Sequence, residues 1–262
     1  NNRAGGVGFL APRGGKPTRA VVDSSIEALQ AIWHRGAVDA DGMTGDGAGI
    51  HIEIPRDFFI EHIARTGHDD DGGRLAVGMV FLPRTDLAAQ ERCRCIVELE
   101  ILAVGHVIYG WRQVPVDTQA LGDKAMATRP EIEQIMFSMS TDIDEQEAER
   151  QLYVVRRRIE KAVTAELISD FYICSMSSRS IIYKGMFLAE QVTEFFPDLN
   201  DERFVSSFAI YHQRYSTNTM PTWKLAQPFR VLAHNGEINT IRGNQNWMTC
   251  HEDRMASDIF GD

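Results

Sequence analysis

The sequence has few cysteines, a shortage of positive charge and no long apolar run. Four cysteines among 262 residues are too few for a disulfide framework and are typical of a reducing compartment. Only 27 basic residues stand against 37 acidic ones, and this net charge of −10 argues against a nucleic-acid partner. No apolar stretch approaches the roughly 20 residues that span a bilayer, and the first residues lack a signal-peptide core. We therefore expect a cytoplasmic chain without a membrane partner.

The composition that remains is that of an ordinary folded protein, with 44% hydrophobic and 24% charged residues. Apolar residues at helical spacing predict four main helices, the first opened by a Ser24-x-x-Glu27 capping box: residues 23–34, 56–65, 142–168 and 240–255. Short apolar or alternating runs predict strands at residues 5–9, 50–54, 75–82, 97–103, 106–113, 134–139, 171–176, 181–183, 206–215 and 230–234. This pattern indicates one α+β domain.

Several common motifs fail on spacing. Asp39-x-Asp41 opens like a calcium loop, but the glycine turn and the final glutamate are missing. The glycines of Gly45-x-Gly47-x-Gly49 precede a strand rather than a helix, which argues against a dinucleotide site. Cys93-x-Cys95 has no second pair nearby, so we expect no metal. Arg156-Arg157-Arg158 lies on an expected helix, where a solvated face is favoured over a partner-binding patch.

The stretch from His212 to Asn246 carries the chemistry. Arg214 follows a predicted strand, and a guanidinium fixed there suits recognition of a small carboxylate. The Asn235 side chain and the Gly236 N–H could together form an oxyanion hole. When the Asn-Gly pair is considered by itself, the alternative of a hairpin turn is favoured.

Motifs spread over nearly the whole chain resemble the N-terminal glutaminase domain of glutamate synthase large subunits, which are class II glutamine amidotransferases. The matching segments are Gly6-Val-Gly-Phe9, His34-Arg-Gly-Ala37, Thr44-Gly-Asp-Gly-Ala-Gly49, Arg156-Arg-Arg-Ile-Glu-Lys161, Ser175-Met-Ser-Ser-Arg179, Tyr183-Lys-Gly-Met186, Phe196-Pro-Asp-Leu199, Arg214-Tyr-Ser-Thr-Asn-Thr219, Ala226-Gln-Pro-Phe-Arg230 and His234-Asn-Gly-Glu-Ile-Asn-Thr-Ile-Arg-Gly-Asn244. The last of these is long and favours glutamate synthase over the class II enzymes that make phosphoribosylamine or asparagine.

The resemblance implies a four-layer α/β/β/α sandwich of the N-terminal nucleophile (Ntn) hydrolase type, with two stacked antiparallel sheets. It implies hydrolysis of L-glutamine by an N-terminal cysteine whose own α-amino group is the base. It further implies that Arg214 holds the glutamine α-carboxylate and that Asn235 and Gly236 hold the oxyanion. Residues that would line the substrate pocket are Tyr215, Ser216 and Thr217. Arg35 would support the site from the end of the first helix, although a surface arginine beside a helix C-terminus is an equal alternative.

The chain departs from the family at its beginning. Gly5 stands where the family has the nucleophilic cysteine, and a glycine has no thiol. Residues 1–4 resemble a remaining propeptide, and residues 5–262 would form a glutaminase domain that is incomplete at its C-terminus, because the aspartate expected to bind the glutamine α-amino group is not found. We therefore expect an inactive, unprocessed form. Intact Arg214, Asn235 and Gly236 favour replacement by engineering over natural decay.

In such a family member, ammonia passes to a synthase module that makes glutamate from 2-oxoglutarate. The resemblance implies no cofactor in this domain, with FMN and an iron–sulfur cluster in the missing synthase part. It implies L-glutamine and that synthase module as partners, and an oligomeric full-length enzyme. The alternative is a domain that binds glutamine without turnover and serves a synthase as a regulatory or structural partner.

Overall fold

The computed structural model of this chain describes residues 6–214, 220–232 and 240–257. Its strands are β1 (Val7–Leu10), β2 (Ala48–Glu53), β3 (Arg74–Leu82), β4 (Val107–Gln113), β5 (Glu131–Met139), β6 (Tyr172–Ser177), β7 (Ser180–Gly185) and β8 (Ala209–Gln213). Its α-helices are α1 (Arg19–Ala31), α2 (Arg56–Arg65), α3 (Leu87–Ala103), α4 (Asp123–Ala127), α5 (Glu145–Ala165), α6 (Val192–Phe195) and α7 (Ile241–Glu252). The mixture confirms the α+β prediction.

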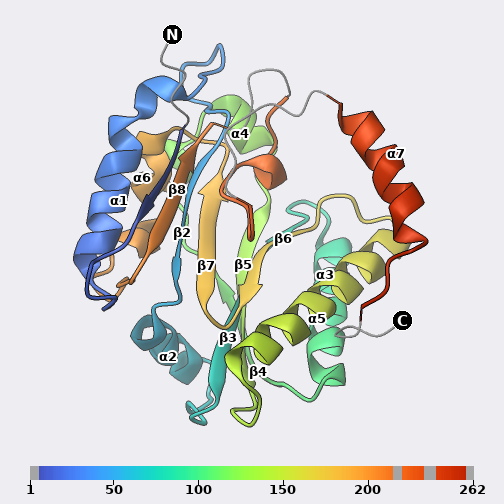
Figure 1. Ribbon diagram of the computed structural model, residues 1–262. Coiled ribbons are helices and arrows are strands. Elements are labelled where there is room, and N and C mark those ends of the chain that lie inside the picture. The colour runs from blue at the N-terminus through green and yellow to red at the C-terminus, as the bar shows by residue number, and fades with distance from the viewer. Residues whose placement is uncertain (1–5, 215–219, 233–239, 258–262) are drawn as a thin grey trace.

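The strands form two stacked four-stranded antiparallel sheets between outer helices (Figure 1). The first sheet has the order β1-β8-β2-β7 and the second the order β4-β5-β3-β6. A tight turn joins β6 to β7 and carries the chain from the second sheet to the first. This arrangement agrees with the sandwich that the resemblance implied.

Strand β3 shows why the second sheet is buried on both faces. Its odd-numbered residues, including Val77 and Met79, belong to the hydrophobic core that also contains the first sheet and α1. Its even-numbered residues, including Ala76 and Val80, belong to a second core beneath α3 and α5. Because side chains alternate along a strand, an almost continuous apolar sequence is needed to fill both cores.

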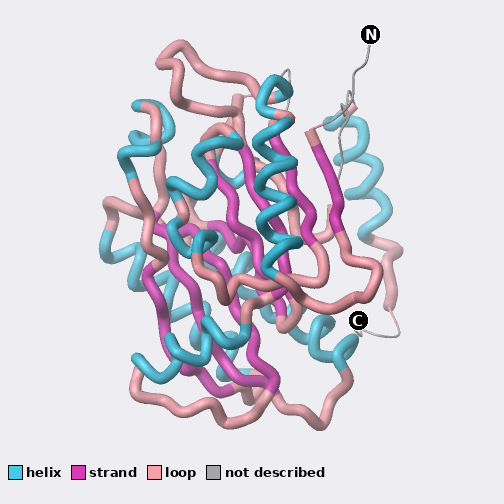
Figure 2. The backbone as a smooth tube through the Cα atoms, turned by 90° about the vertical axis from the view of Figure 1, so that its left-hand side faces the viewer, coloured by secondary structure: helices cyan, strands magenta, loops and turns pink. Residues whose placement is uncertain are grey.

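Helices cover the outer sides of the sandwich. Helix α1 packs on β8 and β1, whereas α3 and α5 pack on each other and on β4 and β6. Figure 2, seen from the side of α1, shows helical segments lying in front of the strands. In α5 the buried Leu152, Val155 and Ile159 recur at helical spacing, and the Asp144 carboxylate caps the helix by accepting from the Glu147 N–H. No helix in the described ranges is long and apolar enough to cross a membrane.

The structure corrects several local predictions. Residues 97–103 are the end of α3 rather than a strand, because Asp86 caps that helix and the apolar positions recur every three to four residues. Residues 230–232 are not part of any strand. The Ser24-x-x-Glu27 pattern falls inside α1, whose N-cap is Thr18. Helix α4 lies where no element was predicted.

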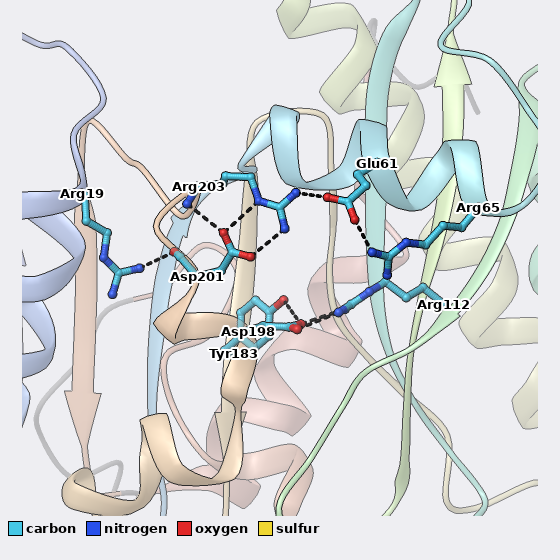
Figure 3. Close-up of polar contacts among 8 residues, drawn as sticks. All are labelled: Arg19, Glu61, Arg65, Arg112, Tyr183, Asp198, Asp201 and Arg203. Carbon is cyan, nitrogen blue, oxygen red and sulfur yellow. Dashed lines mark hydrogen bonds and ion pairs between the residues drawn. The ribbon is translucent and has the colours of Figure 1, made fainter.

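A buried ion pair joins the second sheet to the segment that follows α6. Both Nη atoms of Arg112 on β4 donate to the Asp198 carboxylate, at 2.7 and 2.6 Å, and the two side chains are only 8% and 4% exposed (Figure 3). The Tyr183 hydroxyl of β7 donates to the same carboxylate at 3.0 Å and accepts from Gln134 of β5 at 2.9 Å. Burial raises the pKa of Tyr183 well above its ordinary value, so this hydroxyl stays protonated. The network thus crosses from one sheet to the other.

We expect Asp198→Asn to lower the free energy of unfolding by about 3 kcal/mol, because it leaves the Arg112 charge buried without its anion. Urea denaturation followed by circular dichroism measures this. Asp23→Asn is the matched control, since Asp23 pairs with Arg19 on the exposed surface and its loss should cost less than about 1 kcal/mol. Equal decreases in the free energy of unfolding of the two variants would show that the buried pair stabilises the fold no more than the exposed one.

Candidate active site

The candidate site is built at the end of β8, where β1 begins. The two strands are antiparallel, with Val7 opposite His212, so the chain enters β1 beside the residues that leave β8. The Gln213 N–H donates to the Gly6 carbonyl at 2.7 Å. A β-carbon at Gly6 would lie 2.0 Å from the Gln213 carbonyl oxygen, so only glycine permits this approach. Gly6, at the entry to β1, therefore lies beside the residue that precedes Arg214.

The turn after α1 lies against the same strand end. The Gln213 side-chain amide donates to the Trp33 carbonyl at 3.1 Å, and Arg214 Nη1 donates to the Arg35 carbonyl at 3.3 Å. A β-carbon at Gly36 would lie 2.1 Å from Gln213 Nε2, so a larger residue there would displace the Gln213 side chain. Arg35 therefore contributes its main chain to the site, from a single 3₁₀ turn over residues 33–35.

The glycine-rich segment before β2 supplies the third side. The Arg214 N–H donates to the Gly47 carbonyl at 2.8 Å, and Arg214 Nε lies 3.8 Å from the Asp46 carboxylate. Two hydrogen bonds, each 3.1 Å long, fix Asp46 to Ala37. The Asp46 N–H donates to the Ala37 carbonyl, and the Ala37 N–H donates to the Asp46 carboxylate. The guanidinium thus has one anionic neighbour, and its side chain remains 35% exposed.

The beginning of this glycine-rich segment is fixed by Asp41. The Asp41 carboxylate accepts from the Thr44 hydroxyl and from the N–H groups of Thr44 and Met43. These hydrogen bonds, the one from the Thr44 hydroxyl first, hold the pKa of Asp41 well below its ordinary value. Its oxygens are used to shape the loop that leads to Asp46.

Arg214 has a backbone φ of +86°, in the left-handed region that side chains other than glycine rarely adopt. Such a residue costs on the order of 1–3 kcal/mol and persists where its surroundings fix it, most often at functional sites. Here the contacts with Gly47 and Arg35 fix it. These contacts keep the guanidinium at the end of β8.

Of the site residues expected from the sequence, the structure brings together Arg214 and Arg35. The remaining six lie outside the described residues: Gly5, Tyr215, Ser216, Thr217, Asn235 and Gly236. Sequence reasoning missed the contributions of Asp46 and Gln213. Asp46 lies within the Thr44–Gly49 motif and Gln213 within the His212–Asn246 stretch, and each was a usable signal.

Within residues 6–214, 220–232 and 240–257, no three His, Cys, Asp or Glu side chains gather in a way that could hold a metal ion. The cysteines in these ranges are Cys93, Cys95, Cys174 and Cys250, and all four are free. The chemistry of the described part of the site is therefore that of a guanidinium, a carboxylate and main-chain carbonyls.

We expect Gly47→Ala to destabilise the fold by about 2 kcal/mol, because Gly47 has a φ of +131° and its new β-carbon would lie 2.9 Å from the Ala226 β-carbon. Thermal denaturation measures the change. Gly14→Ala is the control, since a β-carbon at Gly14 meets nothing within 4 Å. An unchanged melting temperature for Gly47→Ala would refute the close packing of this turn.

Comparisons with known proteins identify the family. Residues 5–262 match the family model of the class II glutamine amidotransferases. The chain is 66% identical to the glutamate synthase [NADPH] large chain of Azospirillum brasilense over 98% of its own length and 17% of that relative. It is 44% identical to the ferredoxin-dependent glutamate synthase 2 of Synechocystis sp., over 95% of this chain and 16% of the relative.

The chain is also 41% identical to the glutamate synthase [NADPH] large chain of Bacillus subtilis, over 98% of this chain and 17% of that relative. The chain therefore spans about a sixth of the length of these relatives. The family match covers the segments that meet at Arg214, from the start of β1 to the end of β8. This chain belongs to the class II glutamine amidotransferases.

Proposed function

We propose that this chain is the glutaminase domain of a glutamate synthase. It would hydrolyse L-glutamine to glutamate and ammonia, and the ammonia would be transferred to 2-oxoglutarate in the rest of the enzyme. The observation that carries the proposal is Arg214, held in a left-handed conformation beside Asp46 at the point where β1 begins. Relatives that are 66% and 44% identical and are named glutamate synthases support it.

In the proposed reaction, glutamine binds through its α-carboxylate to the Arg214 guanidinium, which can form two parallel hydrogen bonds with a carboxylate. Asp46 would restrain the guanidinium from the other side. Tyr215, Ser216 and Thr217 would line the pocket, and Arg35 would support it. Asn235 and Gly236 would donate to the oxyanion that forms when the amide carbon is attacked.

Catalysis would need a cysteine thiolate at position 5 and a free α-amino group. The thiolate would attack the amide carbon, ammonia would leave with the proton carried by that amine, and water would release glutamate from the thioester. Gly5 cannot supply the thiolate. We therefore propose that the chain as it stands binds glutamine without hydrolysing it. FMN and an iron–sulfur cluster would belong to the synthase module, which is the proposed partner in an oligomeric enzyme.

The second candidate function is a glutamine-binding domain that regulates or supports a synthase. Gly5 is the observation that favours it, because a domain with this role would need the α-carboxylate site but not the nucleophile. The two candidates differ in what a restored cysteine would achieve.

We expect Gly5→Cys to release glutamate from L-glutamine while the parent chain releases none. The assay is enzymatic detection of glutamate, with mass spectrometry to show that residues 1–4 have been removed and the amine freed. Gly5→Ala is the control for changes that add a side chain but no thiol. Glutamate release by the parent chain would contradict its inactivity. Glutamine binding without turnover in Gly5→Cys would favour the regulatory candidate.

We expect Arg214→Lys to raise the dissociation constant for L-glutamine at least about tenfold, because an ammonium cannot make the two parallel bonds of a guanidinium. Isothermal titration calorimetry on the parent chain measures this. Lysine keeps the β-carbon, so the left-handed backbone is equally strained in both proteins. Arg203→Lys is the control, since Arg203 pairs with Asp201 and Glu61 away from the site (Figure 3). Equal affinities for parent and Arg214→Lys would remove Arg214 from glutamine binding.

A further inference from the structure

Lys184 on β7 is a buried cation that the proposed reaction does not use. Its side chain is 1% exposed. The Nζ atom donates to the Ala226 carbonyl at 2.7 Å, the Lys224 carbonyl at 3.0 Å and the Tyr172 hydroxyl at 3.4 Å. It also lies 4.7 Å from the centre of the Tyr172 ring and 4.8 Å from that of Phe229.

Nothing acidic balances this charge in the part of the chain that the structure describes, where no carboxylate lies within ion-pair distance of Lys184. A buried ammonium without such a partner is costly, so its hydration must be replaced by dipoles and ring faces. Two carbonyls from one short segment and two aromatic rings provide that replacement. The lysine and the 224–226 segment therefore depend on each other.

The segment that Lys184 holds packs against the loop that holds Arg214. Trp223 is 4% exposed and donates from its indole to the Ala125 carbonyl at 3.1 Å, which fixes the beginning of the segment. Ala226 is fully buried against Gly47, where a β-carbon would come within 2.9 Å of it. The Gly47 carbonyl accepts the Arg214 N–H. Contacts thus run without interruption from Lys184 through Ala226 and Gly47 to Arg214.

We propose that Lys184 is a positioning residue of the glutamine site, which holds residues 224–226 against Gly47 and so keeps Arg214 in its left-handed conformation. The expected effect of Lys184 on glutamine binding rests on the proposed function. The physical attachment of the segment does not depend on glutamine and is tested separately.

The groups that face Lys184 set how its attachment responds to pH. Burial lowers the pKa of Lys184 to about 8, and the positive Arg230 acts in the same direction. Cys174 on β6 also faces this lysine, but burial raises its own pKa to about 12, so it is a neutral thiol over this pH range. Tyr172, which is also on β6, keeps its proton because burial raises its pKa to about 12. Glu160 of α5 lies 3.8 Å from Arg230 and partly offsets that charge.

The sign of the pH effect follows from linkage. If the segment detaches, Lys184 becomes hydrated and its pKa returns toward 10.5, so the detached state binds the proton more tightly. Raising the pH through about 8 therefore favours the attached state. The equilibrium for detachment should fall about tenfold between about pH 7 and about pH 9.

Amide hydrogen exchange tests the attachment directly. The N–H groups of Leu225 and Ala226 both donate to the Thr222 carbonyl, so their exchange reports opening of this segment. We expect Lys184→Met to lower their protection about ten- to a hundredfold, because the Lys224 and Ala226 carbonyls would be left without the donor that now satisfies them. In Lys184→Gln, which keeps a donor without the charge, the protection should lie between that of the parent chain and that of Lys184→Met. This variant serves as the test if Lys184→Met does not fold.

Lys161→Met is the matched control, because Lys161 is exposed on α5 and its loss should leave the protection of Leu225 and Ala226 unchanged. The pH dependence, after correction for intrinsic exchange rates, should vanish in both Lys184 variants. Unchanged protection in Lys184→Met, or protection in the parent chain that falls between about pH 7 and about pH 9, would overturn the attachment.

Calorimetry with L-glutamine then tests the consequence for the site. We expect Lys184→Met to raise the dissociation constant about tenfold or more while Lys161→Met leaves it unchanged, since a displaced Gly47 no longer fixes Arg214. Loosened exchange with unchanged glutamine affinity would overturn the positioning role. If the parent chain binds no glutamine at all, the proposed function fails, and the exchange measurement still decides whether Lys184 holds the segment.

Discussion

Close approach of main chains at the end of β8 is the constraint on which the site depends. Gly6 and Gly36 each bring a different segment to Gln213, and Gly47 supports Arg214 while it packs on Ala226. None of these positions has room for a β-carbon in its present geometry. Gly6 approaches the Gln213 main chain, Gly36 approaches the Gln213 side chain, and Gly47 approaches Ala226. The site is therefore fixed to the end of β8 and to the segments packed beside it. The left-handed Arg214 is the cost of this arrangement, and the surrounding contacts repay it.

Two buried cations link separate parts of the sandwich, each in a different way. Arg112 has a carboxylate partner in Asp198, and the Tyr183 hydroxyl extends this network from the second sheet to the first. Lys184, the next residue on β7, relies on main-chain carbonyls and aromatic rings. Successive residues of a strand point to opposite faces, so β7 sends one polar group to each side. One of these contacts ties the two sheets, and the other ties the loop beside the site.

Local sequence patterns predicted the amphipathic elements and failed where several structures fit the same pattern. Helix α2 was predicted at its observed bounds, because Phe58, Phe59 and Ile63 repeat at helical spacing before a polar loop. The end of α3 was predicted as a strand, because a short apolar run has no visible period. Arg35 and Arg214 were grouped only through family motifs, since no local rule brings such distant positions together, and the contribution of Asp46 was missed. Lys184 lies in the Tyr183–Met186 motif, but nothing local indicated its contacts, because its carbonyl partners lie 40 and 42 positions further along the chain.

On the proposed function, carboxylate binding and catalysis can be separated in this chain. The described contacts that fix Arg214 come from Gly47, Asp46 and Arg35. We propose that a glycine in place of the nucleophile removes the covalent step and leaves the carboxylate site in place. The reverse would not hold, because a thiolate at position 5 would act only on a glutamine that Arg214 had oriented. Damage to the support of Arg214 would thus reduce both binding and turnover, whereas damage at position 5 would reduce turnover alone.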